Sequence, residues 1–291
     1  VYGAGVQRVP VSPEQRDPLA PVSETHDKGP LLGRQVAGSE VYDAGLLFPV
    51  ARENARRELP GGDFPGFGED IWQCYELSWL DAQGCPGIYM GLIGVPASSP
   101  NIIESKSLKL YLNSLNGHRF DNNDAALACI TADLSAVAGA TVSIELLAID
   151  DRAFDGGLPA GHCLDTLDVL PAAAPDASLI VASSEESSLV YSHRLRSLCP
   201  VTAQPDWATV VIETRGAAAE AAGLMAYLLS FREHREFHEQ CVERIYCDIQ
   251  QRLAPEYLSV HALYTRRGGL AICPWRCSDS LAAPRYRLNR Q

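Results

Sequence analysis

The sequence lacks any long apolar run. Hydrophobic residues make up 46% of its 291 positions, yet no stretch approaches the ~18–20 consecutive apolar residues that a membrane-spanning helix requires. The first thirty residues also lack the basic start and apolar core of a secretory signal. We therefore expect a cytoplasmic protein with no membrane partner. A chain of this length suits one large domain or two smaller ones.

The cysteines lack the patterns that mark disulfide frameworks and structural zinc sites. Nine cysteines are scattered along a large chain, and an odd, sparse set differs from the dense framework of a small secreted domain. None of their spacings is that of a structural zinc site. We therefore expect reduced thiols and no metal.

A dinucleotide-binding Rossmann fingerprint is also missing. YGAG, at residues 2–5, has neither the third glycine nor a preceding strand and a following helix. A dinucleotide, if one binds, must therefore be held in another way.

Basic residues are scarce. The chain has 24 basic and 36 acidic residues, a net charge of −12, and such a surface repels a phosphate backbone. We expect a small-molecule substrate and no direct nucleic acid binding. Lysine is the scarcest cation, with only Lys28, Lys106 and Lys109 present. Two of these three therefore lie in one short segment, IIESKSLKLY.

Hydrophobic patterning divides the chain into three parts. Residues 1–70 are rich in proline, glycine and charge, which indicates an extended or loop-rich leader. Residues 71–165 and 166–291 each combine strand patterns with helical spacing. This order predicts an α+β fold of two modules, each an antiparallel sheet with two helices on one face.

The two modules share a spacing that suggests an internal duplication. Two sets of residues repeat, the first at an offset of 116 and the second at 115: Leu108, Tyr111, Leu112 and Ser114 with Leu224, Tyr227, Leu228 and Ser230, and Ile130 and Asp133 with Ile245 and Asp248. A nearly constant offset is the signature of a repeated unit.

The stretch SLCPVTAQPDW holds a candidate nucleophile. Cys199 follows HRLRSL, whose arginines and histidine favour a thiolate, because nearby positive charge lowers the pKa of a thiol. Asp206, seven residues further on, would exchange a proton with a bound intermediate. The alternative is a structural thiol followed by an aspartate in a turn.

FHEQ opens a predicted helix with an aromatic ring, an imidazole and a carboxylate. Glu239 either stabilises the helix through its macrodipole or accepts two parallel N–H bonds from a guanine-like base. In the second case Phe237 offers a stacking face.

Two further stretches are suited to phosphate. ESKSLK places Ser105, Lys106 and Lys109 at the start of a helix, where free N–H groups and cations favour an anion. The alternative is a solvated helix face with pairs four residues apart. TRRGGL, which contains Arg267 and Gly268, either closes on phosphate or forms a plain turn.

Taken together, four stretches resemble a known family: NIIESKSLKLYLNSLN, SLCPVTAQPDW, SFREHREFHEQCVERI and YTRRGG. They are similar to the long, two-module form of the NADPH-dependent 7-cyano-7-deazaguanine reductases, the nitrile reductases of queuosine biosynthesis. The similarity extends from about Tyr75 to the C-terminus, and ESKSLKLY separates this family from tunnelling-fold relatives such as GTP cyclohydrolase I. The resemblance implies a tunnelling fold with two modules per chain, each a four-stranded antiparallel sheet with two helices, assembled into a barrel as a homodimer.

The resemblance also implies a reaction and a set of roles. The reaction is the four-electron reduction of a nitrile to a primary amine by two NADPH, in which Cys199 forms a covalent thioimide and Asp206 donates a proton. The implied substrate-binding residues are Ile103, Glu104, Ser105, Phe237, His238 and Glu239. The implied NADPH-binding residues are Ser105, Lys106, Arg267 and Gly268.

Some positions depart from the family pattern. LAICPW has Ala271 and Cys273 where the family commonly has an aspartate and an asparagine, while Leu198 and Ala203 replace residues that are often polar. These changes put cofactor affinity, local stability and rate in question. Two alternatives therefore stay open: a cyclohydrolase-type enzyme with zinc, and a purine- or pterin-binding protein of the same fold without reductase activity.

Overall fold

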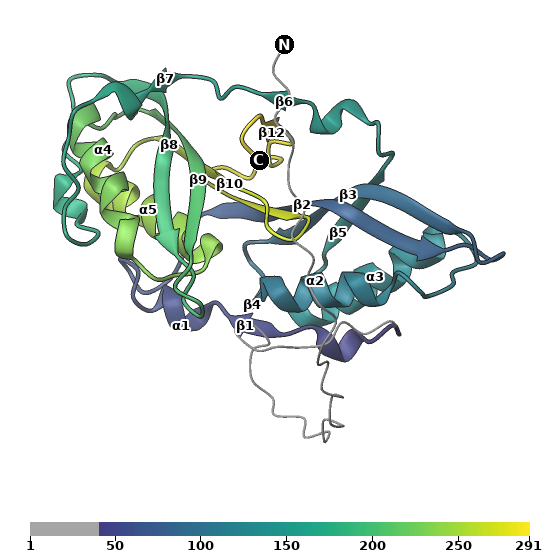
Figure 1. Ribbon diagram of the computed structural model, residues 1–291. Coiled ribbons are helices and arrows are strands. Elements are labelled where there is room, and N and C mark those ends of the chain that lie inside the picture. The colour runs from purple at the N-terminus through teal and green to yellow at the C-terminus, as the bar shows by residue number, and fades with distance from the viewer. Residues whose placement is uncertain (1–40) are drawn as a thin grey trace, which may run out of the picture.

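The computed structural model describes residues 41–291, and residues 1–40, which form most of the expected leader, lie outside the described residues. The main feature is one continuous eight-stranded sheet in the order β5-β3-β2-β11-β10-β9-β8-β7 (Figure 1). Neighbouring strands are antiparallel except β7 and β8. The strands are β2 (Phe67–Leu80), β3 (Pro86–Pro96), β5 (Ser143–Leu147), β7 (His162–Cys163), β8 (Ser187–Leu198), β9 (Pro205–Arg215), β10 (Tyr257–Tyr264) and β11 (Leu270–Cys277).

Four main helices cover the sheet. They are α2 (Ser105–Ser114), α3 (Asn123–Ala138), α4 (Ala221–Leu229) and α5 (His238–Leu253). Figure 1 shows α2 and α3 beside β2, β3 and β5, with α4 and α5 beside β8, β9 and β10. Two apolar cores result, one around Ile93, Leu108 and Ile130 and the other around Ile212, Leu228 and Ile245. The predicted mixed α+β class is therefore confirmed.

Local sequence sets the helix ends. Asn122 begins α3, because its side-chain oxygen accepts a hydrogen bond of 2.9 Å from the Ala125 amide. Gly139 ends the same helix in the left-handed conformation, with φ of 72°. The termini of α2 and α5 form walls of the candidate site described below.

The segment 41–66, which was expected to be part of a loop-rich leader, packs against both halves: Leu47 joins the first core, and Leu59 and Phe64 join the second. It contains a 3-10 turn (Ala44–Leu46), strand β1 (Pro49–Ala51) and helix α1 (Glu53–Arg56). Strand β1 pairs antiparallel with β4 (Asn101–Ile103), directly before α2. The segment therefore helps to fix where α2 begins.

A third apolar cluster lies on the opposite face of the sheet. It includes Leu263 and Trp275 from the strands, with Phe154 and Leu288 from the chain that covers them. The short strands β6 (Gly156–Gly157) and β12 (Arg287–Leu288) pair here. The remaining 3-10 turns are Arg152–Phe154, Leu164–Thr166, Ala177–Leu179 and Ser230–Glu233. No helix within residues 41–291 has the length and apolar character needed to cross a membrane.

Equivalent contacts in the two halves support the internal duplication. The Tyr111 hydroxyl donates to Asp133 at 2.6 Å, and the Tyr227 hydroxyl donates to Asp248 at the same distance. Both hairpins also change register at matching points, between Cys74 and Leu77 in β2 and between Ser192 and Leu195 in β8. The repeated letters of the sequence therefore mark repeated interactions.

Candidate active site

A pocket of about 250 Å³ lies where the starts of α2 and α5 meet the β8–β9 and β10–β11 turns. It is lined by Trp72, Ile103, Ser105, Lys106, Lys109, Cys199, Pro200, Thr202, Gln204, Asp206, Phe237, His238, Glu239, Thr265, Arg267, Gly268, Leu270 and Ile272. Every site residue predicted from the sequence lines this pocket except Glu104.

Cys199 lies in the tight turn that joins β8 to β9. Its amide donates to the Gln204 carbonyl at 2.9 Å, and its carbonyl accepts from the Ala203 amide at 3.0 Å. Ala203 closes the turn at φ of 54°, a left-handed conformation that costs an alanine roughly 1 kcal/mol. The turn thus holds a buried thiol against the pocket.

Asp206, near the start of β9, is buried between two basic side chains. Its carboxylate lies 3.2 Å from His238 Nε2 and 2.8 Å from Arg267 Nη2. The His238 ring stacks on Tyr264, with centroids 3.8 Å apart and planes 15° apart. This stack fixes the imidazole beside the carboxylate, so a proton can pass between Asp206, His238 and a ligand in the pocket.

The first turn of α5 supplies a second carboxylate. Phe237 caps the helix, and its amide donates to the Gln240 side chain at 3.1 Å. Glu239 is 3% exposed. Burial, reinforced by the negative charge of Asp70, raises the pKa of Glu239 to about 7.

Glu104 does not line the pocket, because its carboxylate caps α2. The two oxygens accept from the amides of Lys106 and Ser107, both at 2.8 Å, and the residue is fully buried. The cap orients the helix start so that Ser105 and Lys106 face the pocket. Glu104 therefore contacts the helix backbone, one residue away from the pocket wall.

The cationic side of the pocket combines α2 with the β10–β11 turn. Lys109 forms an ion pair with Glu76, and Arg267 is 45% exposed while paired with Asp206. Gly268 and Gly269 both have positive φ. Gly269 has a φ of 78°, a left-handed conformation that favours glycine at this position.

Pocket residues that sequence reasoning did not select are mainly apolar. Trp72, Leu270 and Ile272 form the floor where β2 pairs with β11. Their alternation along the strands was a visible signal for a buried face, but it could not separate core from pocket. Within residues 41–291, no group of three His, Cys, Asp or Glu side chains is arranged to hold a metal ion.

The fold and pocket define a class: a mixed α+β enzyme in which a cysteine thiol and an aspartate line one pocket, with cations at its rim. Comparison with known families gives the particular member. Residues 39–146 match the family described as "Nitrile reductase, 7-cyano-7-deazaguanine-reductase N-term", and residues 205–283 match "QueF-like protein".

Full-length relatives agree with these matches. The NADPH-dependent 7-cyano-7-deazaguanine reductase of Desulfotalea psychrophila is 47% identical over 93% of this chain and all of its own length. The enzyme of the same name from Teredinibacter turnerae is 49% identical over 86% of this chain and 91% of its own. The chain belongs to the 7-cyano-7-deazaguanine reductase family.

Proposed function

We propose that this protein reduces the nitrile of 7-cyano-7-deazaguanine to the primary amine of 7-aminomethyl-7-deazaguanine, with NADPH as reductant, in the biosynthesis of queuosine. The observation that carries the proposal is the β8–β9 turn, which brings Cys199 and Asp206 to the lining of one pocket. Whole-length identity to reductases of this name supports the same reaction.

The chemistry requires a nucleophile and an acid at one carbon. The Cys199 sulfur adds to the nitrile carbon, one C–N π bond breaks, and Asp206 delivers a proton to the nitrogen, which gives a thioimide. When bound, two NADPH would supply two hydrides, which with two further protons convert the thioimide to the neutral primary amine and return Cys199 as its thiol, as the C–S bond breaks. Because a nitrile accepts hydride poorly, conversion to the thioimide makes its C=N easier to reduce.

The ring of the substrate is assigned to the first turn of α5. Glu239 would accept two N–H bonds from the guanine-like edge, while His238 and Phe237 border the ring. Ile103 and Ser105 form the opposite wall. Glu104 would act indirectly, because its carboxylate fixes the start of α2.

The cationic rim fits NADPH. Ser105 and Lys106 at the start of α2, with Arg267 and Gly268 in the facing turn, would hold its phosphates, because a helix start and cations favour anions. Lys109 extends the same rim. These residues would hold the cofactor in the pocket that Cys199 also lines.

We also propose the tunnelling-fold arrangement, with the sheets of two chains joined into the barrel of a homodimer. The sheet described here has open ends at β5 and at the two-residue strand β7, and paired edges would remove them. A cytoplasmic setting suits the nine cysteines, all of which are free thiols.

An adduct experiment tests the proposal. Intact-mass measurement after mixing with 7-cyano-7-deazaguanine should show an added mass equal to the nitrile, and Cys199→Ala should lose it. Cys85→Ala is the matched control, because Cys85 is exposed and lies outside the pocket. In parallel, NADPH absorbance should fall only when nitrile is present. Nitrile binding without NADPH oxidation, or an adduct that survives Cys199→Ala, would contradict the proposed chemistry.

A further inference from the structure

The proposed proton donor, Asp206, is held between two basic side chains. Asp206 Oδ1 lies 2.8 Å from Arg267 Nη2, and Asp206 Oδ2 lies 3.2 Å from His238 Nε2. The side chain of Asp206 is only 6% exposed. A guanidinium keeps its positive charge at every physiological pH, and an opposite charge this close favours the ionised form of a carboxyl group. The ion pair with Arg267 therefore stabilises Asp206 as a carboxylate.

This ion pair conflicts with the step that is proposed for Asp206. When the Cys199 sulfur adds to the nitrile carbon, the thiol proton must leave the sulfur and a proton must reach the nitrogen. A carboxylate that accepts the first proton and delivers the second passes through its neutral acid form. A guanidinium bound to one of its oxygens opposes that form. The reaction thus requires the contact between Asp206 and Arg267 to open.

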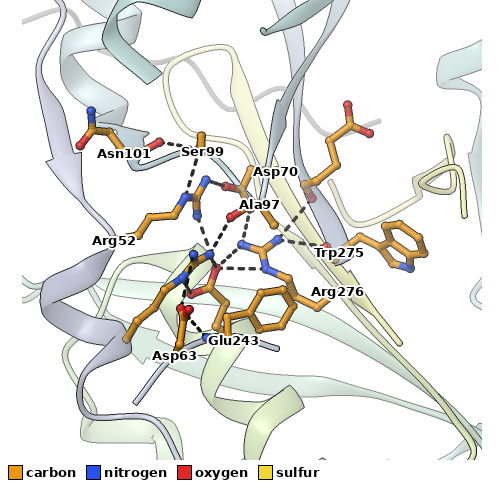
Figure 2. A network of polar contacts seen from close by, with 12 residues as sticks. Arg52, Asp63, Asp70, Ala97, Ser99, Asn101, Glu243, Trp275 and Arg276 are labelled. Atoms are coloured by element: carbon orange, nitrogen blue, oxygen red, sulfur yellow. Dashed lines mark hydrogen bonds and ion pairs between the residues drawn. The ribbon is translucent and has the colours of Figure 1, made fainter. Parts of the chain in front are cut away.

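The exposure of Arg267 distinguishes its ion pair from the structural ion pairs of the protein. In the network of Figure 2, Arg52 and Arg276 contact the two oxygens of Asp70, and none of these three side chains is more than 3% exposed. Arg267, by contrast, is 45% exposed although its partner is buried. An ion pair with a solvent-exposed partner contributes little to stability, so Arg267 can exchange one anion for another at low cost.

The way in which Arg267 uses its nitrogens also indicates a contact that can open. Its side chain contacts Asp206 and the Pro205 carbonyl through the same nitrogen, Nη2. Arg52 in the buried network uses all three of its nitrogens, toward Ser99, Asp70 and Glu243. The contact of Arg267 is therefore not the two-nitrogen fork that gives an arginine–carboxylate pair its strength.

A phosphate at the rim of the pocket would compete with Asp206 for this arginine. Arg267 lines the pocket together with Ser105 and Lys106 at the start of α2, where the proposed function assigns the phosphates of the cofactor. A phosphate offers a guanidinium more acceptor oxygens than a carboxylate does, and the planar fork of arginine suits it. Arg267 therefore has two alternative partners, the Asp206 carboxylate and a phosphate.

We propose that Arg267 is a positioning residue for Asp206: it holds Asp206 as a carboxylate before the cofactor binds, and it turns to a cofactor phosphate afterwards. The inference rests on the proposed function, because it takes Cys199 as the nucleophile and the rim as a phosphate site. The covalent step balances within the pocket. The S–H proton of Cys199 moves to Asp206, the C–S bond forms as one C–N π bond breaks, and Asp206 gives the proton to the nitrogen. Formation of the thioimide is thereby coupled to occupation of the phosphate site.

The experiment measures how fast the thioimide forms in the absence of any hydride donor. The full chain is mixed with 7-cyano-7-deazaguanine at neutral pH, and intact mass at successive times gives the first-order rate at saturating nitrile. Arg267→Gln should raise this rate about two- to fivefold, the size of effect expected from an ion pair with one exposed partner. A change in nitrile affinity would appear separately, as a change in the concentration needed for saturation.

Two matched variants separate the charge of Arg267 from its shape. Arg267→Lys keeps a positive charge in the turn and should stay near the rate of the unaltered protein. Arg266→Gln removes the neighbouring arginine, whose guanidinium lies 4.6 Å from the centroid of the Tyr75 ring, and it should leave the rate unchanged. A merely structural role for Arg267 predicts the opposite sign, because a disturbed pocket would form the thioimide more slowly in Arg267→Gln.

Oxidised cofactor provides a second test, which needs no substitution and so serves even if a variant unfolds. NADP+ has the phosphates but no hydride to give, so its addition should speed thioimide formation by the unaltered protein about two- to fivefold. An unchanged or slower rate in Arg267→Gln, or no acceleration of the unaltered protein by NADP+, overturns the inference while leaving nitrile reduction intact. Failure of the unaltered protein to form any adduct overturns the proposed function instead.

Discussion

The buried carboxyl of Glu239 makes the stability of the protein depend on pH. A group whose pKa rises on folding holds its proton more tightly in the native state, so it favours the native state at low pH. For Glu239 that contribution is fully present below the ordinary glutamate pKa of about 4.3. It is lost as the pH rises through about 7. Burial of this carboxyl therefore costs the protein stability at neutral pH.

Glu239→Gln removes this loss. The measured quantity is the free energy of unfolding of Glu239→Gln minus that of the unaltered protein. This difference should be larger at pH 8 than at pH 5, by as much as about 3 kcal/mol. Urea unfolding of the ligand-free protein at the two values measures the change. Glu186→Gln, at an exposed glutamate, should give the same difference at both values. A Glu239→Gln difference that does not change with pH would contradict the linkage.

The sequence predicts the location of a site residue well where its motif allows few structural contexts, and poorly where the same motif fits several. Cys199 and Asp206 were selected together from one stretch and Arg267 from another, and all three line one pocket in the structure. Glu104 shows the limit, because a carboxylate before a helix serves equally well as a cap or as a ligand-binding group. Its two hydrogen bonds to the backbone of α2 became visible only with the helix start in place.

At the scale of elements, the β1–β4 pair joins segment 41–66 to the pocket wall. Phe48 accepts a hydrogen bond from the Glu104 amide at 3.0 Å, and the Arg52 amide donates to Pro100 at 2.9 Å. Val50 lies between them, opposite Ile102, where the antiparallel alternation requires its N–H as a donor. This short ladder holds both the start of α2 and Arg52.

Val50→Pro should disturb that wall, because proline has no N–H to donate. We expect the KM for NADPH and for the nitrile to rise about five- to tenfold, a range that corresponds to roughly 1–1.4 kcal/mol. Adduct formation at saturating nitrile should persist, since β8 and β9 are untouched. Val50→Thr keeps the N–H and the branched side chain and should behave as the unaltered protein. Unchanged KM values in Val50→Pro would show that β1 does not position α2.

The elements that sequence patterning left unassigned have physical explanations. Helix α3 (NDAALACITADLSAVA) has small and apolar residues around most of its circumference, so no clear stripe marks it. Strand β8 contains SHRLR, where a bulge interrupts the alternation on which strand recognition depends. The segment 41–66 is rich in glycine and proline, and tertiary pairing with β4, which no local pattern encodes, gives it structure.

At the scale of the whole molecule, the two halves contain the same tyrosine-to-aspartate hydrogen bond in different surroundings. Asp248 accepts from Tyr227, whereas Asp133 accepts from both Tyr111 and Tyr42. Asp248 is also the more buried of the two. The same tyrosine-to-aspartate bond is therefore supported by a second donor in the first half only.

Removing each hydroxyl should reveal this difference. Tyr227→Phe leaves a buried carboxyl without that donor and should lower the free energy of unfolding by about 1–3 kcal/mol. Tyr111→Phe should cost less, because Tyr42 still donates to Asp133 at 2.7 Å. Denaturant unfolding of the two variants makes the comparison directly. Equal losses would mean that the hydrogen bond from Tyr42 contributes little.

The duplicated halves also differ in what they contribute to chemistry. With the offset of 116, Lys106 at the start of α2 corresponds to Ala222 in α4, although Glu104 and Glu220 precede the two helices with nearly the same backbone angles. Matching bridges, Leu80 to Arg119 and Leu198 to Arg235, align Cys199 with Asp81. The first copy contributes Lys106 and Lys109 to the pocket lining, and the second contributes Cys199 and Arg267. Neither copy alone therefore supplies the whole lining, so cutting the chain between the halves would leave two incomplete pockets.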